Sequence, residues 1–318
     1  MATVLTIDPD GMRFRINGRP VFLLGASYYG GLGASDGFIA ADLADLRGLG
    51  FNWIRVWCTW GAFGRDVSAV GRSGEASEPG MSRLAALCER ADGLGMVVDV
   101  TFSRGNGVVN PPLHGQSSHL AALRAVAERL KPYRNVYLDM GNERNILDRR
   151  FVRFEDLAEL RRAIRDIDPD RLATASASED IPLTDVSRYL LLAGVDFLAP
   201  HRPRSAGSPA QTAARTREYL DEARRVLGHP VPVHYQEPFR RDWRAWQPAA
   251  EDFVADLRGA IESGAAGWCF HNGDAQGRDD GRPRRSFDMS DDEGRLFDQL
   301  DDEERRSIER IGEEARGL

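Results

Sequence analysis

The sequence predicts a (β/α)8 barrel, also called a TIM barrel, with a short β-hairpin in front of it. Short apolar runs alternate with longer amphipathic segments along nearly the whole chain. The apolar runs are almost continuous, as strands buried on both faces of a parallel sheet require. The 318 residues are enough for one such barrel. No linker interrupts the pattern at mid-chain, so we expect a single catalytic domain over residues 1–318.

The predicted hairpin and strands follow from turn residues and apolar runs. Met12–Asn17 and Pro20–Leu24 flank the turn Asn17-Gly18-Arg19, where the glycine suits a positive φ. Eight strand-like runs follow, at residues 22–27, 52–58, 96–102, 135–141, 172–177, 195–200, 231–236 and 266–271.

The segments between these runs carry apolar residues at three- and four-residue spacing, which is typical of helices with one buried face. The predicted helices are Asp36–Leu49, Met81–Leu94, Ser118–Leu130 with Ser118 as its cap, Phe154–Ile167, Val186–Leu192, Thr212–Leu227, Ala249–Ser263 and a last segment from Asp291 towards Gly317. Two doubly wound domains are the alternative. They are disfavoured because no glycine-rich phosphate-binding turn follows the first strand.

Composition excludes several classes of partner. The net charge of −7 and the absence of a long basic run argue against nucleic acid. No apolar run reaches the ~20 residues needed to span a membrane. The N-terminus lacks the charged start and apolar core of a signal peptide, so we expect a cytoplasmic protein, or a secreted one if a signal has been removed. The three cysteines show no metal-binding spacing.

Two glutamates stand where a barrel carries its active site, at the carboxyl ends of the strands. Glu143 follows the fourth predicted strand and Glu237 the seventh. These strands lie three positions apart around the ring, so the two carboxylates are expected to face each other across the mouth. Glycoside hydrolysis needs such a pair, one protonated and one ionised. A separation of about 5–5.5 Å implies retention of configuration, and about 6.5–9.5 Å implies inversion.

Other polar and aromatic side chains near the strand ends are expected to line the substrate site. They are Arg55, Asn142, His201, Tyr235, Trp268, His271 and Asn272. Trp243 and Trp246 follow the seventh strand and would form either a wall of the cleft or simple loop packing.

Nearly the whole chain resembles the clan A glycoside hydrolases, and family 5 cellulases and mannanases in particular. Three motifs carry this resemblance, each at one strand or turn of the family pattern. They are Phe14-Arg15-Ile16-Asn17-Gly18-Arg19-Pro20-Val21-Phe22 at the opening hairpin, Asn52-Trp53-Ile54-Arg55-Val56 at the second strand, and Asp139-Met140-Gly141-Asn142-Glu143 at the end of the fourth.

The resemblance implies a retaining hydrolase that cleaves β-glycosidic bonds in an oligo- or polysaccharide, without a metal or other cofactor. It implies that Glu143 is the acid/base and that Glu237 is the nucleophile. It further implies that Arg55 holds the nucleophile ionised, that Asn142 hydrogen-bonds the sugar 2-hydroxyl, and that Trp268 stacks on the sugar at the cleavage point.

The chain also departs from the family pattern. Thr101 stands where the family often has histidine, and Pro203 where it often has tyrosine after His201, so we expect a divergent family. Arg55 could instead pair with a structural carboxylate such as Asp99.

Two other functions remain open. One is a metal-dependent sugar isomerase-like barrel with Glu143, His201 and Glu237 as ligands, although Asn-Glu is not a ligand spacing. The other is a non-catalytic sugar-binding barrel, which would be expected to lack one carboxylate. Sugar identity, linkage, endo or exo action and oligomeric state cannot be read from the sequence.

Overall fold

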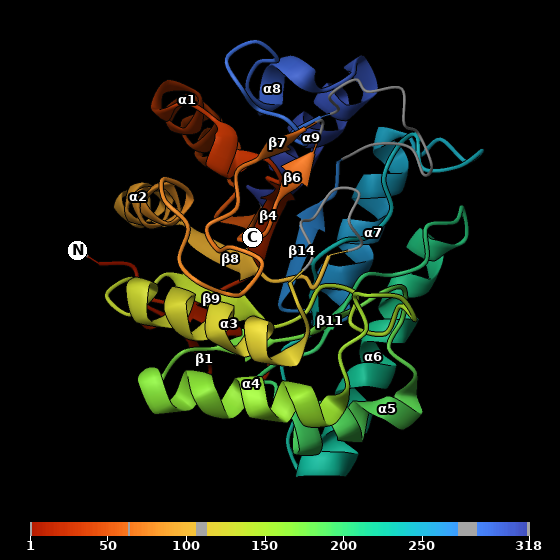
Figure 1. Ribbon diagram of the computed structural model, residues 1–318. Helices are drawn as coiled ribbons and strands as arrows, with labels where there is room; N and C mark the ends of the chain where they lie inside the picture. Colours follow the sequence, from red (N-terminus) through yellow and green to blue (C-terminus); the bar gives the residue numbers. More distant parts are fainter. Residues whose placement is uncertain (1, 63, 106–112, 273–284, 317–318) are drawn as a thin grey trace.

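The computed structural model describes residues 2–62, 64–105, 113–272 and 285–316, and places a ring of helices around a central β-barrel (Figure 1). The ring follows sequence order, as the colours of Figure 1 show. The barrel strands are β4 (Leu23–Ser27), β5 (Trp53–Trp57), β8 (Val97–Thr101), β9 (Val136–Asp139), β10 (Ala173–Thr174), β11 (Ser176–Ala177), β12 (Ala199–Pro200), β13 (His234–Tyr235) and β14 (Gly267–Phe270).

The barrel closes through parallel pairing. Seven strands form one sheet in the order β10-β9-β8-β5-β4-β14-β13. The fifth predicted strand breaks at Ala175, so that β10 pairs with β9 and β11 pairs with β12. A parallel bridge between Leu198 and Val233 joins the sixth strand to the seventh and completes the ring. The predicted (β/α)8 fold is confirmed, although the sixth and seventh strands are shorter than expected.

The helices match the predicted segments with small shifts in their ends. They are α1 (Asp36–Gly48), α2 (Gly80–Gly93), α3 (Gln116–Leu130), α4 (Phe154–Ile167), α5 (Leu183–Ser187), α6 (Ser208–Leu227), α7 (Ala250–Glu262), α8 (Leu296–Gln299) and α9 (Asp302–Ala315). A 3-10 turn at Gly31–Gly33 precedes α1, and a π-helical turn at Arg188–Ala193 continues α5. Among the described residues, no helix is both long and apolar enough to cross a membrane.

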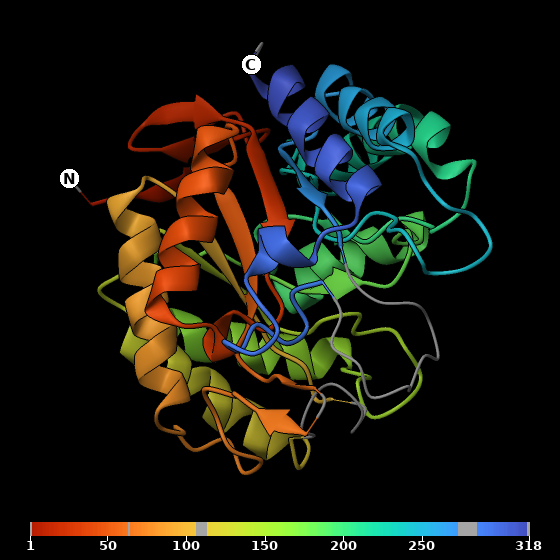
Figure 2. The ribbon, with the colours of Figure 1, turned by 90° about the horizontal axis from the view of Figure 1, so that it is seen from above.

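Two helix ends differ from the prediction. Ser118 does not cap α3, because the helix begins two residues earlier, with Gly115 before its first turn. The last amphipathic segment is broken at Leu300, whose backbone is extended. Asp301 then starts α9 by accepting a hydrogen bond from the backbone of Glu304. The C-terminal helix α9 packs along α7 (Figure 2).

The predicted N-terminal hairpin is present and gains a third strand. Strands β1 (Leu5–Ile7), β2 (Phe14–Ile16) and β3 (Arg19–Val21) form an antiparallel sheet. The turn between β2 and β3 has positive φ at Asn17 and Gly18. Phe14 packs edge-on against Phe197, 5.1 Å between ring centroids, inside the amino end of the barrel. This end is therefore filled with apolar side chains, which leaves the carboxyl end for a site. A two-stranded ribbon, β6 (Gly61–Ala62) and β7 (Arg65–Asp66), follows β5.

Side chains on each barrel strand alternate between the interior and the helices. On β5, Trp53 and Arg55 point inward, whereas Ile54 packs against the helices. On β14, Cys269 faces the interior and Trp268 faces the helical layer. This alternation decides which of the predicted site residues reach the barrel mouth.

Candidate active site

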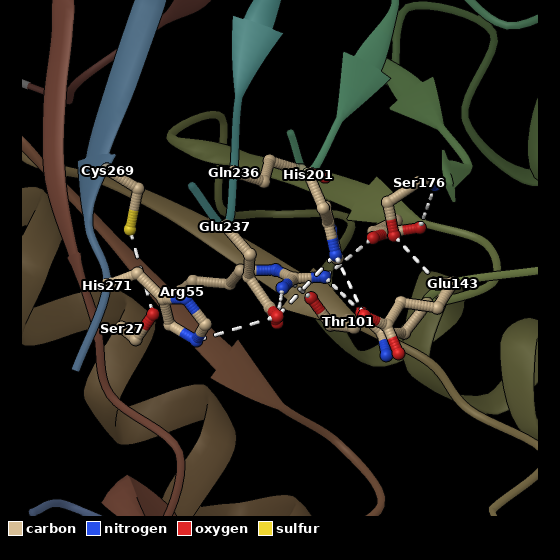
Figure 3. Close-up of polar contacts among 12 residues, drawn as sticks. Ser27, Arg55, Thr101, Glu143, Ser176, His201, Gln236, Glu237, Cys269 and His271 are labelled. Carbon is tan, nitrogen blue, oxygen red and sulfur yellow. Dashed lines mark hydrogen bonds and ion pairs between the residues drawn. The ribbon is translucent and has the colours of Figure 1, made fainter. Parts of the chain in front are cut away.

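Glu143 and Glu237 point towards each other across the carboxyl end of the barrel (Figure 3). An oxygen of each carboxylate and a ring nitrogen of His201 all lie within 4.8 Å of one another. The Glu143 side chain is 13% exposed and the Glu237 side chain 4% exposed, so Glu143 is the more accessible of the two. The predicted pairing of the two carboxylates across the mouth is therefore observed.

Local structure holds the Glu143 backbone in place. Asn142 donates its backbone N–H to the Phe102 carbonyl at 2.8 Å, and the Glu143 N–H donates to the Ser176 hydroxyl at 3.1 Å. Glu143 has φ of +45°, in the left-handed region that residues with a side chain seldom adopt. Strain of this kind persists where surrounding structure fixes the backbone, and it is concentrated at functional sites.

Arg55 is fully buried and joins three carboxylates. Its Nη1 pairs with Glu237 Oε1, its Nε lies 3.1 Å from Asp99 Oδ2, and its Nη2 lies 2.9 Å from Asp139 Oδ2. Its Nη2 also donates to Asn142 Oδ1 at 2.9 Å. Burial raises the pKa of Asp99 to about 8, even though the Arg55 charge opposes this shift. Arg55 thus has both of the roles considered from sequence: it contacts Glu237 and it pairs with structural acids.

His201, at the end of β12, lies between the two glutamates. Its Nδ1 is 3.4 Å from Glu143 Oε1 and 3.5 Å from Glu237 Oε2. Ionised carboxylates can only accept, so Nδ1 carries the proton. The buried Nε2 has no hydrogen-bond partner among the residues that the structure describes.

His271 lies beside Glu237 and is held as a neutral ring. Burial lowers its pKa well below the usual value. Its Nδ1 donates to the Pro238 carbonyl at 3.2 Å, because a carbonyl can only accept. Its Nε2 therefore accepts from the Tyr29 hydroxyl, and it lies 3.6 Å from Glu237 Oε2. Tyr29 was not predicted from sequence, although it directly follows the first barrel strand.

Tyr29 belongs to an aromatic cluster next to Glu237. Its ring centroid lies 5.8 Å from that of Trp57, 5.0 Å from Trp60 and 4.7 Å from Phe287. Trp57 also lies under the Arg55 guanidinium at 5.2 Å. The aromatic side chains beside Glu237 thus come from the ends of the first two strands and from Phe287, beyond the eighth.

Trp268 and Tyr235 do not reach the site, so the predictions that placed them there are wrong. Both are fully buried between barrel and helices. The Trp268 indole donates to Asp256 Oδ2 at 2.7 Å, on α7. The Tyr235 hydroxyl lies 2.6 Å from the Thr216 hydroxyl, on α6. Strand alternation explains both errors, since residues next to an inward-facing position face outward.

Thr101 and Asn272 lie in different surroundings. Thr101, where the family often has histidine, accepts from Arg55 Nε at 3.0 Å and donates to Asp99 at 3.1 Å. Asn272 is fully buried after β14, and neither atom of its side-chain amide has a hydrogen-bond partner within the described ranges. In the part of the chain that the structure describes, no hydrogen bond links Asn272 to either glutamate.

Arginines that the sequence analysis missed surround the glutamates. Arg204, between β12 and α6, places Nη2 at 3.0 Å from Glu237 Oε2 and 3.4 Å from Glu143 Oε1. Arg150 places Nη1 at 3.4 Å from Glu143 Oε2. The chain is rich in arginine, and nothing in the sequence marks these two as different from those on its surface.

These cations set the protonation state of Glu143 and Glu237. Burial alone would raise the pKa of Glu143, but the hydrogen bond from His201 and the charges of Arg204 and Arg150 outweigh it and lower this pKa. Burial likewise opposes ionisation of Glu237, yet the charges of His201 and Arg55 lower its pKa. Both carboxylates are therefore ionised at neutral pH.

A pocket of about 310 Å³ opens beside Glu143. Its walls come from the loops after the fourth, fifth, sixth and seventh strands. The lining residues are Glu143, Ile146, Arg150, Ser178, Glu179, Arg202, Pro203, Arg204, Ser205, Trp243 and Arg244. Trp243 is therefore part of the pocket wall, whereas Trp246 packs on Phe239 with 4.9 Å between centroids.

The site fits a guanidinium better than a metal ion. Glu143, His201 and Glu237 have the residue types of a metal site. However, Glu237 Oε1 faces Arg55 and Oε2 faces Arg204, so a cation would have to displace a positive charge that is already bound. This argues against the sugar isomerase-like alternative.

Comparison with known proteins shows likeness in fold. No protein-family model matches the chain, and no curated protein matches it. An exo-β-1,4-mannosidase from Opitutaceae bacterium strain TAV5 aligns with a TM-score of 0.67 and 21% identity, over 98% of this chain and 62% of that one. A glycoside hydrolase family 5 structure from Bacteroides vulgatus ATCC 8482 gives 0.63 and 14%, over 85% and 62%.

Another solved structure aligns over its full length. The endo-1,4-β-mannanase from Rhizomucor miehei gives a TM-score of 0.66 at 11% identity, over 99% of this chain and 100% of that one. At these identities the comparisons show a shared barrel fold, and they support the resemblance to family 5 structures. The chain spans 62% of the length of the Opitutaceae and Bacteroides proteins.

Proposed function

We propose that this protein is a retaining β-glycoside hydrolase with Glu237 as nucleophile and Glu143 as acid/base. The observation that carries this proposal is the pair of facing carboxylates, with an oxygen of each within 4.8 Å of the other. Such a spacing is nearer to the ~5–5.5 Å between the carboxyl groups of retaining enzymes than to the ~6.5–9.5 Å of inverting enzymes.

The surroundings of the two glutamates support different roles. Glu237 is bound by the fully buried Arg55, which favours a permanently ionised and well-oriented nucleophile. Glu143 is more exposed, and its cationic partners Arg150 and Arg204 come from loops. When a sugar displaces Arg204, burial and the nearby charge of Glu237 raise the pKa of Glu143 towards that of a proton donor.

The reaction then proceeds by double displacement. The Glu237 carboxylate attacks the anomeric carbon, and the bond to the leaving oxygen breaks as that oxygen takes the proton of Glu143. Glu143, now ionised, removes a proton from water. The water oxygen attacks the same carbon and releases Glu237, so that the product keeps its original configuration.

Other site residues would position the sugar. Asn142 uses its amide oxygen to accept from Arg55, which leaves its NH2 group to donate to a sugar hydroxyl. The cluster of Tyr29, Trp57, Trp60 and Phe287 lies beside the nucleophile, although each of its side chains is at most 9% exposed. The similar structures named as a mannosidase and a mannanase make β-mannosides the first substrates to test.

The proposal is tested with Glu143→Gln and Glu237→Gln on aryl β-mannosides, aryl β-glucosides, aryl β-glucuronides and β-linked oligosaccharides. Removing the nucleophile is expected to lower kcat on the order of 10⁴-fold or more. Removing the acid/base is expected to lower it by roughly 10²–10⁴-fold on substrates with poor leaving groups. Glu128→Gln, at an exposed position of α3, is the matched control and should retain activity. A wild-type protein inactive on the whole panel, or full activity in either site variant, contradicts the proposal.

The two roles are separated by leaving group and by azide. A 2,4-dinitrophenyl glycoside needs no proton donor, so glycosylation by Glu143→Ala should be largely retained, whereas Glu237→Gly should be inactive on it. Azide should rescue Glu143→Ala with retained configuration and Glu237→Gly with inverted configuration. The opposite stereochemistry would exchange the two assignments.

A further inference from the structure

Arg240, which follows β13, is a buried cation beside Trp243. It is 8% exposed. Within the described ranges it forms no ion pair, and its Nε has no hydrogen-bond partner. Its Nη1 lies 3.4 Å from His271 Nε2, and its guanidinium lies near the rings of Trp243 and Phe287. Burying a guanidinium without an ion pair is unfavourable, so such a group points to a partner that is bound only at times.

Arg204 and Arg240 both contact the ring of Trp243. The guanidinium carbons of both arginines are 4.5 Å from the centroid of Trp243. Burial, and then the charge of Arg204, lowers the pKa of Arg240, although the charges of Glu237 and Glu143 oppose this shift. An anion that contacts both guanidinium groups would offset the repulsion between them.

The position of this pair connects it to the reaction. Arg204 is the cation that contacts Glu143 and Glu237, and both Arg204 and Trp243 line the pocket beside Glu143. At about 310 Å³ the pocket lies at the small end of the range for ligand sites, of a size for one sugar residue. A ligand that enters it meets Arg150 and Arg204 in the wall.

We propose that Arg204 and Arg240 form an anion subsite that binds the carboxylate or sulfate of an acidic sugar. Guanidinium groups suit both anions, because their planar N–H groups match pairs of oxygens. Arg204 then leaves the two glutamates and pairs with the anion of the substrate. This inference rests on the proposed glycosidase function, and it names acidic glycans as the substrate class.

By drawing Arg204 away from the two glutamates, the anion also changes the pKa of Glu143. Arg204 lowers the pKa of Glu143. When Arg204 pairs with the anion instead, the pKa of Glu143 rises. An acidic sugar is therefore expected to raise the pKa of Glu143 more than a neutral sugar of the same shape.

The test measures binding rather than turnover, so it is independent of the glycosidase assignment. Thermal unfolding of the wild-type protein is followed with sodium glucuronate, with glucose 6-sulfate, and with glucose plus sodium chloride at equal ionic strength. One or both acidic sugars should raise Tm by about 3 °C at ten times Kd, and glucose should not. The glucuronate and sulfate arms show which anion the subsite prefers.

Arg240→Met separates anion binding from a structural role. Because Arg240 is buried and unpaired, this variant should have an unchanged or raised Tm without ligand, and it should lose the anion-dependent rise. Arg241→Met is the matched control, since Arg241 pairs with Asp301 at 3.0 Å instead, and it should keep that rise.

Three results would overturn the subsite. They are equal shifts with acidic and neutral sugars, a full anion-dependent rise in Arg240→Met, and a lowered Tm of Arg240→Met with unchanged anion binding. Loss of hydrolysis in Glu143→Gln and Glu237→Gln together with any of these would leave the proposed function in place and refute only the subsite.

Discussion

Replacing Arg55 by methionine should destabilise the protein strongly and in a pH-dependent way. The substitution keeps an unbranched side chain of similar length but removes the charge that joins Asp99, Asp139 and Glu237. All four side chains are at most 4% exposed, so water cannot replace the lost guanidinium. Breaking a buried ion pair by removing one partner costs about 3–5 kcal/mol of unfolding free energy.

The loss should be larger in alkali than in mild acid. Burial already raises the pKa of Asp99 to about 8 with Arg55 present. Without Arg55 this pKa rises further, so the folded variant binds protons that the unfolded chain does not. A raised folded-state pKa gives stability that is present at low pH and is lost as pH rises. The loss of unfolding free energy in Arg55→Met should therefore be smaller at ~pH 6 than at ~pH 9.

Urea unfolding at both pH values measures this deficit. Arg225→Met on α6 is the control, because Arg225 is 69% exposed and pairs with Glu222 at the surface. Its loss should stay below about 1 kcal/mol at either pH. The reasoning is refuted if Arg55→Met loses no more than this control, or if its loss is the same at both pH values.

Three further outcomes can be measured. Burial lowers the pKa of His234 to about 3, so its contribution to stability is present above its unfolded pKa and is lost as pH falls. The unfolding free energy of His234→Gln should therefore fall less steeply between about pH 6 and pH 4, by roughly 1.4 kcal/mol per pH unit, and an unchanged slope would exclude a neutral buried ring. Glu143 has φ of +45°, so Glu143→Gly should be more stable than Glu143→Ala by about 1–2 kcal/mol in urea unfolding; equal stabilities would mean that no strain is stored there. Trp268→Phe removes the hydrogen bond to the buried Asp256 and should cost about 1–3 kcal/mol of stability, with kcat/KM unchanged. A large rise in KM with unchanged stability would instead return Trp268 to the sugar site.

The fold could be predicted closely because its signals are local. A run such as residues 96–102 is apolar except at Asp99 and Thr101, since a barrel strand is buried on both faces, and β8 forms within it. Phe154–Ile167 has one apolar face and forms α4 with those bounds. The third N-terminal strand was missed because β1 has three residues, too few for a periodic pattern.

The sequence by itself determined the barrel, the positions of Glu143 and Glu237 at strand ends, and the pairing partner Arg55. Each of these depends on strand order, and strand order follows from the alternation of apolar runs and amphipathic helices. Only the tertiary structure decided which neighbours face the mouth. Trp268 and Tyr235 lie one position out of phase with the interior, and the phase of a two- or four-residue strand cannot be read from its own sequence. The cations Arg204 and Arg240 reach the glutamates and Trp243 from loops, whose paths depend on contacts between residues distant in sequence.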